Sequence, residues 1–182
     1  SSAASDVYKR QVLDTAVEML AYVLPEDKLD GMLVYTADKN GEGDRYFCKD
    51  GKIQRESDDG SRDSRYPKED DHELDVPLAV LVNGNSASAS EVFTGAVMDY
   101  DAGIVVGTTT FGKGIVQNLI PLGDGTAIKL TTAHYYTPNG FDLHGKGLEP
   151  DVVVEMDEEL QKKAVVELSE DNQLQAAIEA MN

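Results

Sequence analysis

Two short apolar runs separated by a helical segment constrain the fold of this chain more than any other feature. Residues 77–82 form a continuous apolar run, the pattern of a strand buried on both faces, and residues 103–107 form a second one. A helical pattern covers residues 91–100 between them. A strand, a helix and a strand at this spacing predict a right-handed βαβ unit with parallel strands. The predicted fold class is therefore α/β.

The flanking sequence predicts secondary structure on both sides of this unit. Apolar periodicity, interrupted by glycine, proline and asparagine, marks each element. The predicted elements are a helix over 12–24, strands near 32–35 and 45–47 joined at Asn40-Gly41, an antiparallel hairpin of 115–120 with 127–136, a turn at 137–140, a strand at 152–154, and closing helices over 158–168 and 172–181. Residues 49–75 are acidic, polar and poor in apolar residues, so they predict a solvated loop or flap.

Charge and cysteine content narrow the classes of function. The 182 residues include 34 acidic and 16 basic side chains, which gives a formal net charge of −18. Such a chain repels phosphate backbones, so sequence-independent nucleic-acid binding is not expected. The one cysteine, Cys48, excludes an internal disulfide framework and is predicted to be a packed small side chain. His72, His134 and His144 lack metal-ligand spacing, so neither a metal nor a cofactor is predicted.

The βαβ unit brings two polar segments to one edge of the sheet. Parallel strands end at the same edge, which is where open α/β sheets bind ligands. Beyond the first strand lie Ser86, Ser88 and Ser90, and beyond the second lies Lys113 between two glycines. Serine and lysine form a known nucleophile–base pair, and a helix N-terminus offers N–H donors to an oxyanion. A lysine titrates near ~10.4 unless burial lowers its pKa, and Phe111 with the apolar strands is expected to provide that burial.

Plainer interpretations fit the same residues. Ser88 and Glu91 have the spacing of a capping box, and a Gly-Lys-Gly segment is often a turn with an exposed lysine. His134 or His144 could also replace the lysine as the base of a Ser–His pair. The pattern alone leaves these alternatives open.

Several consecutive motifs make the pattern more specific. They are Leu-Val-Asn at 81–83, Ser-Ala-Ser-Ala-Ser-Glu at 86–91, Gly-Thr-Thr-Thr-Phe-Gly-Lys-Gly at 107–114, Val-Gln at 116–117, Lys-Leu-Thr-Thr-Ala at 129–133, Tyr-Tyr-Thr-Pro at 135–138 and Gly-Lys-Gly-Leu-Glu-Pro-Asp at 145–151. In this order and spacing, the stretch from Val12 to Glu155 resembles the carboxy-terminal processing (tail-specific) serine proteases.

The resemblance implies a ClpP/crotonase-like α/β core and a mechanism. By motif position, Ser88 is the nucleophile, Lys113 is the general base, Gln117 orients the lysine, and the Ala89 N–H is an oxyanion donor. The implied function is a serine endopeptidase that cleaves proteins near their C-termini through an acyl-enzyme. The implied substrates are unfolded or C-terminally exposed proteins. The resemblance further implies an upstream PDZ domain in the parent protein and a location outside the cytoplasm, membrane-tethered or secreted.

The resemblance also divides the chain. Residues 1–11 are predicted to be a non-native leader, because 6–11 resemble the translated end of a sequencing-library adapter. Residues 12–156 would be a partial protease core truncated at its N-terminus, and 157–182 a C-terminal helical segment. Lys9-Arg10-Gln11 stands where the family carries a glycine-rich segment with the second oxyanion donor. This chain alone is therefore expected to be poorly active.

Two other classes of function compete with the protease. A non-catalytic homologue could keep the fold as a peptide-binding module, and the shared core topology also suggests a crotonase-type acyl-CoA enzyme. Intact Ser88 and Lys113 favour the protease, because a decayed site would have lost one of them and an enolate-stabilising enzyme needs neither.

Overall fold

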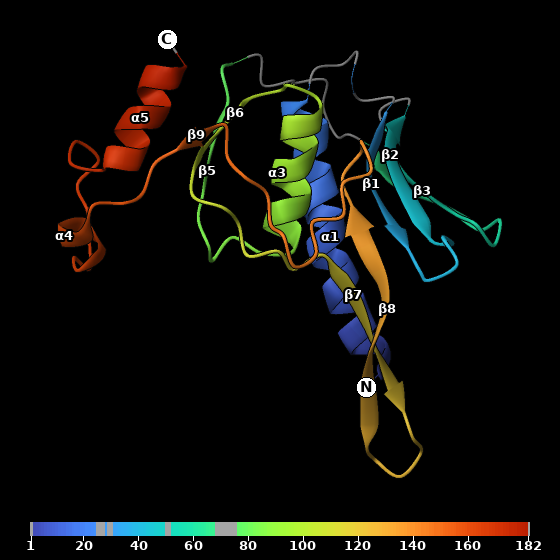
Figure 1. The fold of residues 1–182 in the computed structure, drawn as a ribbon. Coiled ribbons are helices and arrows are strands. Elements are labelled where there is room, and N and C mark those ends of the chain that lie inside the picture. The colour runs from blue at the N-terminus through green and yellow to red at the C-terminus, as the bar shows by residue number, and fades with distance from the viewer. Residues whose placement is uncertain (1, 25–27, 29–30, 50–51, 68–75, 182) are drawn as a thin grey trace.

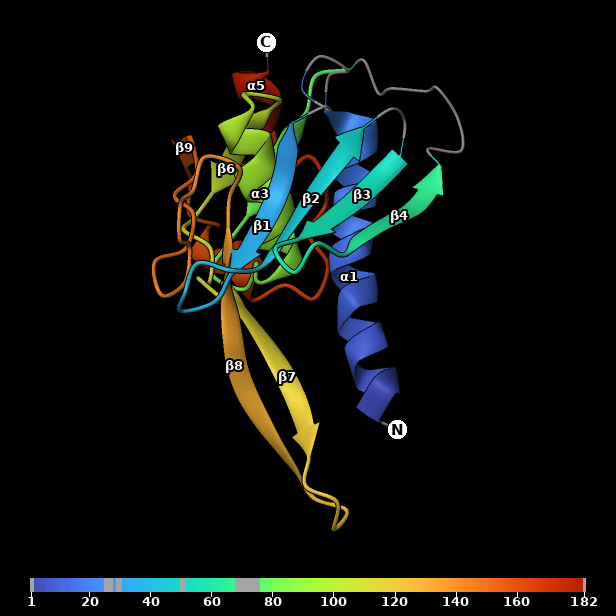
Figure 2. The same ribbon diagram turned by 90° about the vertical axis from the view of Figure 1, so that its right-hand side faces the viewer.

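Two helices lie between two sheets. The computed structural model describes residues 2–24, 28, 31–49, 52–67 and 76–181. Helices α1 (Ser2–Val23) and α3 (Ala89–Asp99) have a parallel sheet on one side and a curled antiparallel sheet on the other (Figures 1 and 2). The predicted α/β class is confirmed.

The parallel sheet contains the predicted βαβ unit. Its strands are β5 (Ala79–Val82), β6 (Ile104–Gly107) and β9 (Val152–Val153), in the order β5-β6-β9. Both strand pairs are parallel, and α3 connects β5 to β6. β6 is buried as predicted, but the prediction that residues 77–82 are buried on both faces is wrong. Leu81 is 44% exposed because β5 is the edge strand of this sheet.

The antiparallel sheet has six strands in the order β4-β3-β2-β1-β8-β7. They are β1 (Met32–Ala37), β2 (Asp44–Lys49), β3 (Lys52–Ser57), β4 (Arg62–Pro67), β7 (Ile115–Pro121) and β8 (Ala127–Tyr136). The predicted pairings of β1 with β2 and of β7 with β8 are confirmed. The β7–β8 hairpin extends well beyond the body (Figures 1 and 2).

The core forms where α1 meets α3. Leu13, Val17, Leu20 and Leu24 recur at helical spacing on α1 and its end, and all four are buried. They pack in one cluster with residues of β1, β2 and α3. The packing of the two helices therefore fixes the position of the α3 N-terminus, which carries the candidate site.

Two sequence predictions are corrected outside the core. Residues 52–67 are not a loop but strands β3 and β4, which extend the sheet from β2. Ion pairs such as Arg45–Asp58 link neighbouring segments and give their polar side chains partners. Lys49, the first residue of the predicted flap, ends β2, and residues 50–51 and 68–75 lie outside the described residues.

The C-terminal segment is less helical than predicted. Helix α4 covers only Glu158–Gln161, whereas α5 (Asn172–Ala180) closely matches its prediction. Val165 and Leu168 are 78% and 73% exposed, so the segment after α4 has no apolar face to bury that would hold a helix. At the other end, α1 already includes residues 2–11. None of the described helices is both long and apolar enough to cross a membrane.

Adjacent residues on α1 test the core assignment. Leu20 has no exposed surface, whereas Met19 is 51% exposed. We expect Leu20→Ala to lower the free energy of unfolding by about 2–5 kcal/mol, because truncation leaves a cavity. Met19→Ala, the matched control, should change it by less than about 1 kcal/mol. Urea unfolding followed by circular dichroism measures both, and equal losses would contradict the assignment.

Candidate active site

The carboxyl ends of β5 and β6 bring the two predicted polar segments together. Val82 pairs with Gly107 at the ends of the strands, and the Phe111 N–H donates to the Ser86 carbonyl at 2.9 Å. The loop that follows β5 is therefore hydrogen-bonded to the loop that follows β6. This is the juxtaposition that the parallel topology predicts.

Ser88 has an unusual backbone conformation at the start of α3. Its φ and ψ angles are 60° and −114°, a region that residues other than glycine seldom adopt. Its carbonyl accepts the N–H groups of Glu91 and Val92 at 2.9 and 3.0 Å, which begins the helix. Backbone strain of this kind persists only where surrounding contacts hold it, and it is concentrated at functional sites.

The buried carboxylate of Glu91 holds this turn. It has no exposed surface and accepts hydrogen bonds from the Ser88 N–H at 2.9 Å, the Thr110 hydroxyl at 2.6 Å, the Gly112 N–H at 2.6 Å and the Lys113 N–H at 2.8 Å. One side chain thus fixes the backbone at both Ser88 and Lys113.

Sequence analysis recognised only part of this arrangement. The hydrogen bond from the Ser88 N–H to Glu91 is the capping-box contact that the spacing predicted. The three bonds to residues 110–113 were missed because they join segments from different strand ends. A signal was present in the sequence, since Glu91 is the one acidic residue in the first turn of a mostly apolar helix.

The loop that carries Lys113 is fixed from a second side. The Gly145 N–H donates to the Gly112 carbonyl at 2.9 Å, and Gly112 has a φ of 82°, which favours glycine. The Lys113 side chain itself is exposed, and Phe111 is 63% exposed. The burial predicted for the lysine is therefore wrong.

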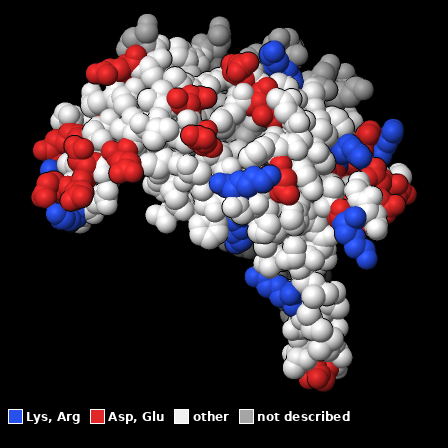
Figure 3. All heavy atoms as spheres, in the orientation of Figure 1, with Lys and Arg blue, Asp and Glu red and all other residues white. Residues whose placement is uncertain are grey.

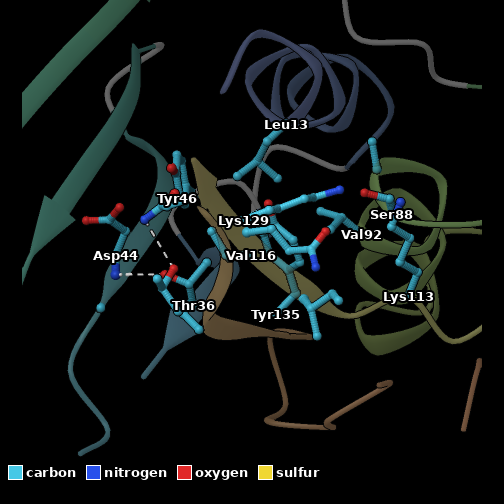
Figure 4. Close-up of a pocket in the computed structure, with 17 residues that line it drawn as sticks. Leu13, Thr36, Asp44, Tyr46, Ser88, Val92, Lys113, Val116, Lys129 and Tyr135 are labelled. Carbon is cyan, nitrogen blue, oxygen red and sulfur yellow. Dashed lines mark hydrogen bonds between the residues drawn. The ribbon is translucent and has the colours of Figure 1, made fainter. Parts of the chain in front are cut away.

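The four predicted site residues share one cleft. Ser88, Ala89, Lys113 and Gln117 all line a cleft of about 430 Å³, and Ser88 and Lys113 lie at the same end of it (Figure 4). Ala89 is the first residue of α3, a position whose N–H has no acceptor within the helix.

Gln117 occupies the cleft from strand β7. Its side-chain amide donates to the Thr131 hydroxyl at 3.4 Å across the β7–β8 pair. Its predicted contact with the lysine stays a prediction. The catalytic roles of Ser88, Lys113 and Ala89 likewise remain to be tested, although their proximity agrees with those roles.

Apolar and phenolic side chains form much of the cleft wall. Val92 and Val116 line it together with Tyr46 and Tyr135. Burial raises the pKa of both tyrosines, and the negative charge of Asp14 raises it further in each case. Both phenols are therefore neutral near pH 7 and leave the wall uncharged.

The histidines lie apart from this cleft. His134 contacts Asp142 at 3.2 Å through Nδ1, and its ring centroid is 4.9 Å from that of His144. Neither is among the residues that line the cleft. His72 lies outside the described residues. In the described part of the chain, no three histidine, cysteine or carboxylate side chains are grouped so that they could hold a metal ion. Cys48 is buried, as predicted.

The α/β core thus brings a serine with a strained backbone and a lysine to one cleft. Comparison with known proteins assigns the chain to a family. The profile of peptidase family S41 matches residues 12–154, so the chain belongs to peptidase family S41.

Curated relatives match part of the chain. A carboxy-terminal-processing protease of Bartonella bacilliformis is 54% identical over 79 residues, which cover 43% of this chain and 18% of the relative. A probable CtpA-like serine protease of Staphylococcus epidermidis is 52% identical over 80 residues, or 44% of this chain and 16% of the relative. The matched segments thus span less than a fifth of these relatives.

Solved structures support the same fold. The photosystem II D1 C-terminal processing protease aligns with a TM-score of 0.57 and 33% identity, over 79% of this chain and 31% of that one. An S41 protease from Bacteroides fragilis aligns with a TM-score of 0.64 and 18% identity, over 93% of this chain and 41% of that one, and shows the fold alone.

The four bonds to Glu91 generate a prediction about stability. In Glu91→Gln the new amide group places two donors where the carboxylate accepted bonds, so buried N–H groups lose their acceptor. We expect a loss of about 1–3 kcal/mol in the free energy of unfolding. Glu42→Gln, at an exposed position, should change it by less than about 0.5 kcal/mol. A fully stable Glu91→Gln variant would show that the four bonds contribute nothing net.

Burial of Tyr46 generates a second prediction. Because folding raises the pKa of this phenol above its ordinary value of 10.0, the folded state retains the proton that the unfolded chain releases at higher pH. Its contribution to stability is therefore complete below pH 10 and falls as the pH rises above 10. The loss reaches up to about 1.4 kcal/mol per pH unit. Urea unfolding at pH 8 and pH 11 should show a smaller decrease for Tyr46→Phe than for the unmodified chain, and equal decreases would refute the prediction.

Proposed function

We propose that this chain carries the catalytic residues of a serine endopeptidase that cleaves proteins near their C-termini. The observation that carries the proposal is the placement of Ser88 and Lys113 at one end of one cleft, with both backbones bonded to Glu91. Membership of peptidase family S41 and the names of the relatives support a peptidase. The roles of the individual residues are part of the proposal, and their shared cleft supports them.

The proposed reaction has two stages. The Ser88 hydroxyl attacks the carbonyl carbon of the scissile peptide, and its proton passes to the neutral amine of Lys113. The Ala89 N–H donates to the oxyanion, and the lysine then returns the proton to the leaving amine. Water hydrolyses the resulting ester and restores Ser88. Gln117 is proposed to orient Lys113 from the facing strand.

The strained turn at Ser88 suits this role. Ser88 has a positive φ and directly precedes α3. In other hydrolases a strained turn of this kind before a helix exposes the nucleophile's side chain. The four bonds to Glu91 hold the turn before substrate binds, so no ordering is needed at the moment of reaction.

The context of the parent protein is part of the proposal. We expect its substrates to be unfolded proteins or proteins with exposed C-termini, an upstream PDZ domain to capture them, and its location to be outside the cytoplasm. These expectations rest on family membership. They concern the parent protein, because the matched segments span less than a fifth of the curated relatives.

The exposure of Lys113 favours a second candidate. The apolar cover predicted for the lysine is missing, because Lys113 is exposed and Phe111 is 63% exposed. A chain with such a lysine could retain the cleft as a peptide-binding module without chemistry. Reaction of Ser88 with a covalent probe separates the two candidates.

Fluorophosphonate labelling tests the nucleophile without requiring a natural substrate. We expect one adduct on Ser88, located by peptide mass spectrometry, and none in Ser88→Ala. Lys113→Ala should slow labelling about 10²–10⁴-fold, because the hydroxyl loses its base. Ser90→Ala, two residues away, and His134→Ala should leave the rate unchanged, and circular dichroism would confirm that each variant folds.

The labelling result discriminates among the mechanisms. An adduct that forms equally fast in Lys113→Ala would contradict the lysine base. A slow reaction in His134→Ala would favour the Ser–His alternative, and a folded chain that forms no adduct at all would favour the peptide-binding module.

A further inference from the structure

The β7–β8 hairpin has two faces of different character. Gln117 of β7 and Lys129 of β8 line the cleft. Leu13 of α1 and Val92 of α3 line the same cleft, so this face of the hairpin is turned toward the helices (Figure 4). Successive side chains of a strand point to opposite faces of the sheet. The other face, here named the outer face, therefore carries the neighbours of Lys129 along β8.

Isoleucine and leucine side chains occupy the outer face. Lys129 pairs with Leu119 across the hairpin. The next pair toward the tip joins Ile120 to Ile128, so these two side chains point away from the cleft. Leu130 follows Ile128 by two residues and lies on the same face. Three apolar side chains from two strands are thus neighbours on the outer face.

The apolar surface continues to the tip of the hairpin. The Leu122 N–H donates to the Thr126 carbonyl at 2.9 Å, which extends the pairing by one step beyond Pro121. Leu122 therefore lies on the same face as Ile120, two residues before it. The apolar stripe of the outer face consists of Ile120, Leu122, Ile128 and Leu130.

Polar groups on the outer face are neutral and paired. Asn118 and Thr132 adjoin the apolar stripe, and the Asn118 amide donates to the Thr132 hydroxyl at 3.2 Å. Residues 118–122 and 126–132 are all described, and their outer face has no charged side chain. An uncharged surface of this kind is typical of the centre of a protein interface.

The apolar stripe is open to solvent. Its four side chains are 43–53% exposed, whereas Leu119 on the cleft face is partly buried. The hairpin extends well beyond the body, so the described elements leave the stripe uncovered (Figures 1 and 2). Together the four side chains expose on the order of 400 Å², the size of patch that marks an interaction site on a soluble protein.

A second apolar layer would stabilise this part of the hairpin. A two-stranded hairpin is at best marginally stable in water, and packing against another layer stabilises it. Two hairpins stacked about 10 Å apart bury the apolar face of each, as two packed sheets do. The stripe of a second copy supplies such a layer, because a two-fold axis brings identical faces together.

The distribution of charge favours two hairpins that run in opposite directions. With a formal net charge of −18, two bodies placed side by side repel each other. Figure 3 shows acidic side chains over the body and at the tip of the hairpin, and basic ones where the hairpin meets the body. Opposite directions hold the two acidic bodies apart and place each acidic tip near the basic side chains at the base of the other hairpin.

We propose that the apolar stripe is an interface that packs face to face against the stripe of a second copy, with the two hairpins in opposite directions. Its area is about half of the ~800 Å² that each partner buries in a stable complex, so the dimer is weak. The cleft lies on the other face of the hairpin and stays open in both copies. The interface therefore does not depend on the chemistry proposed for Ser88.

Sedimentation equilibrium tests the interface with the complete 182-residue chain. We expect a monomer–dimer equilibrium with a dissociation constant between about 10 µM and 1 mM. The double variant Ile128→Thr, Leu130→Thr should weaken the dimer by about tenfold or more, because threonine keeps the preference for a strand and removes apolar contact. Val165→Thr with Leu168→Thr removes exposed apolar groups outside the hairpin and should leave the constant unchanged. Circular dichroism would confirm that each variant folds.

Cross-linking tests which face of the hairpin forms the interface. With a short bismaleimide, Ile128→Cys should give a covalent dimer, because the stacked stripes bring the two positions 128 together. Lys129→Cys, the neighbouring position on the cleft face, should stay monomeric. Cys48 is buried, so the unmodified chain measures the background.

Four results would overturn the proposal. They are a monomer at all concentrations up to about 1 mM, a dimer that the threonine variant leaves unchanged, equal cross-linking at positions 128 and 129, and binding of a monomeric chain to phosphatidylcholine vesicles. Equal cross-linking would indicate pairing of strand edges, and vesicle binding that the threonine variant loses would assign the stripe to a lipid surface instead of a second copy.

Discussion

The buried carboxylate of Glu91 is the contact on which the candidate site depends. It accepts hydrogen bonds from four groups in two segments of the chain. One group is the Ser88 N–H, and the other three belong to residues 110–113. A buried carboxylate without partners would be strongly unfavourable, so the loops that follow β5 and β6 must bring their donors to it. The same requirement places the proposed nucleophile beside the proposed base.

Close backbone approach makes this arrangement possible. A side chain on Gly107 would place its Cβ 1.9 Å from the Val82 carbonyl oxygen, and Gly107 has a φ of 134°. Only glycine allows β6 to end this close to β5. The two loops therefore leave the sheet side by side, within reach of one carboxylate.

The cleft exists because three parts of the fold meet there. Ser88 and Ala89 belong to the helix layer, Lys113 follows the parallel sheet, and Gln117 and Lys129 belong to the antiparallel hairpin. Packing of α1 against α3 sets the position of the first group relative to the others. Displacement of the hairpin would alter the substrate-binding side and leave the bonds between Glu91 and its partners intact.

Much of the fold could be predicted because its signals are local. Apolar runs at 77–82 and 103–107 specify strands, their spacing specifies a parallel crossover, and the turn residues at Asn40-Gly41 and Asp124-Gly125 specify hairpins. Strands β3 and β4 were missed because their residues are polar. Their pairing depends on β2 as a neighbour rather than on apolar periodicity.

The sequence by itself determined which residues are candidates for catalysis. It also determined that the ends of β5 and β6 bring Ser88 and Lys113 to one edge of the sheet, because the order of the elements specifies a parallel topology. Only the tertiary structure decided what surrounds them. The four bonds to Glu91, the exposure of Lys113 and the entry of Lys129 from β8 all depend on the distances between segments remote in the chain. Those distances are set by how the helices and the two sheets pack, and packing leaves no periodic pattern in the sequence.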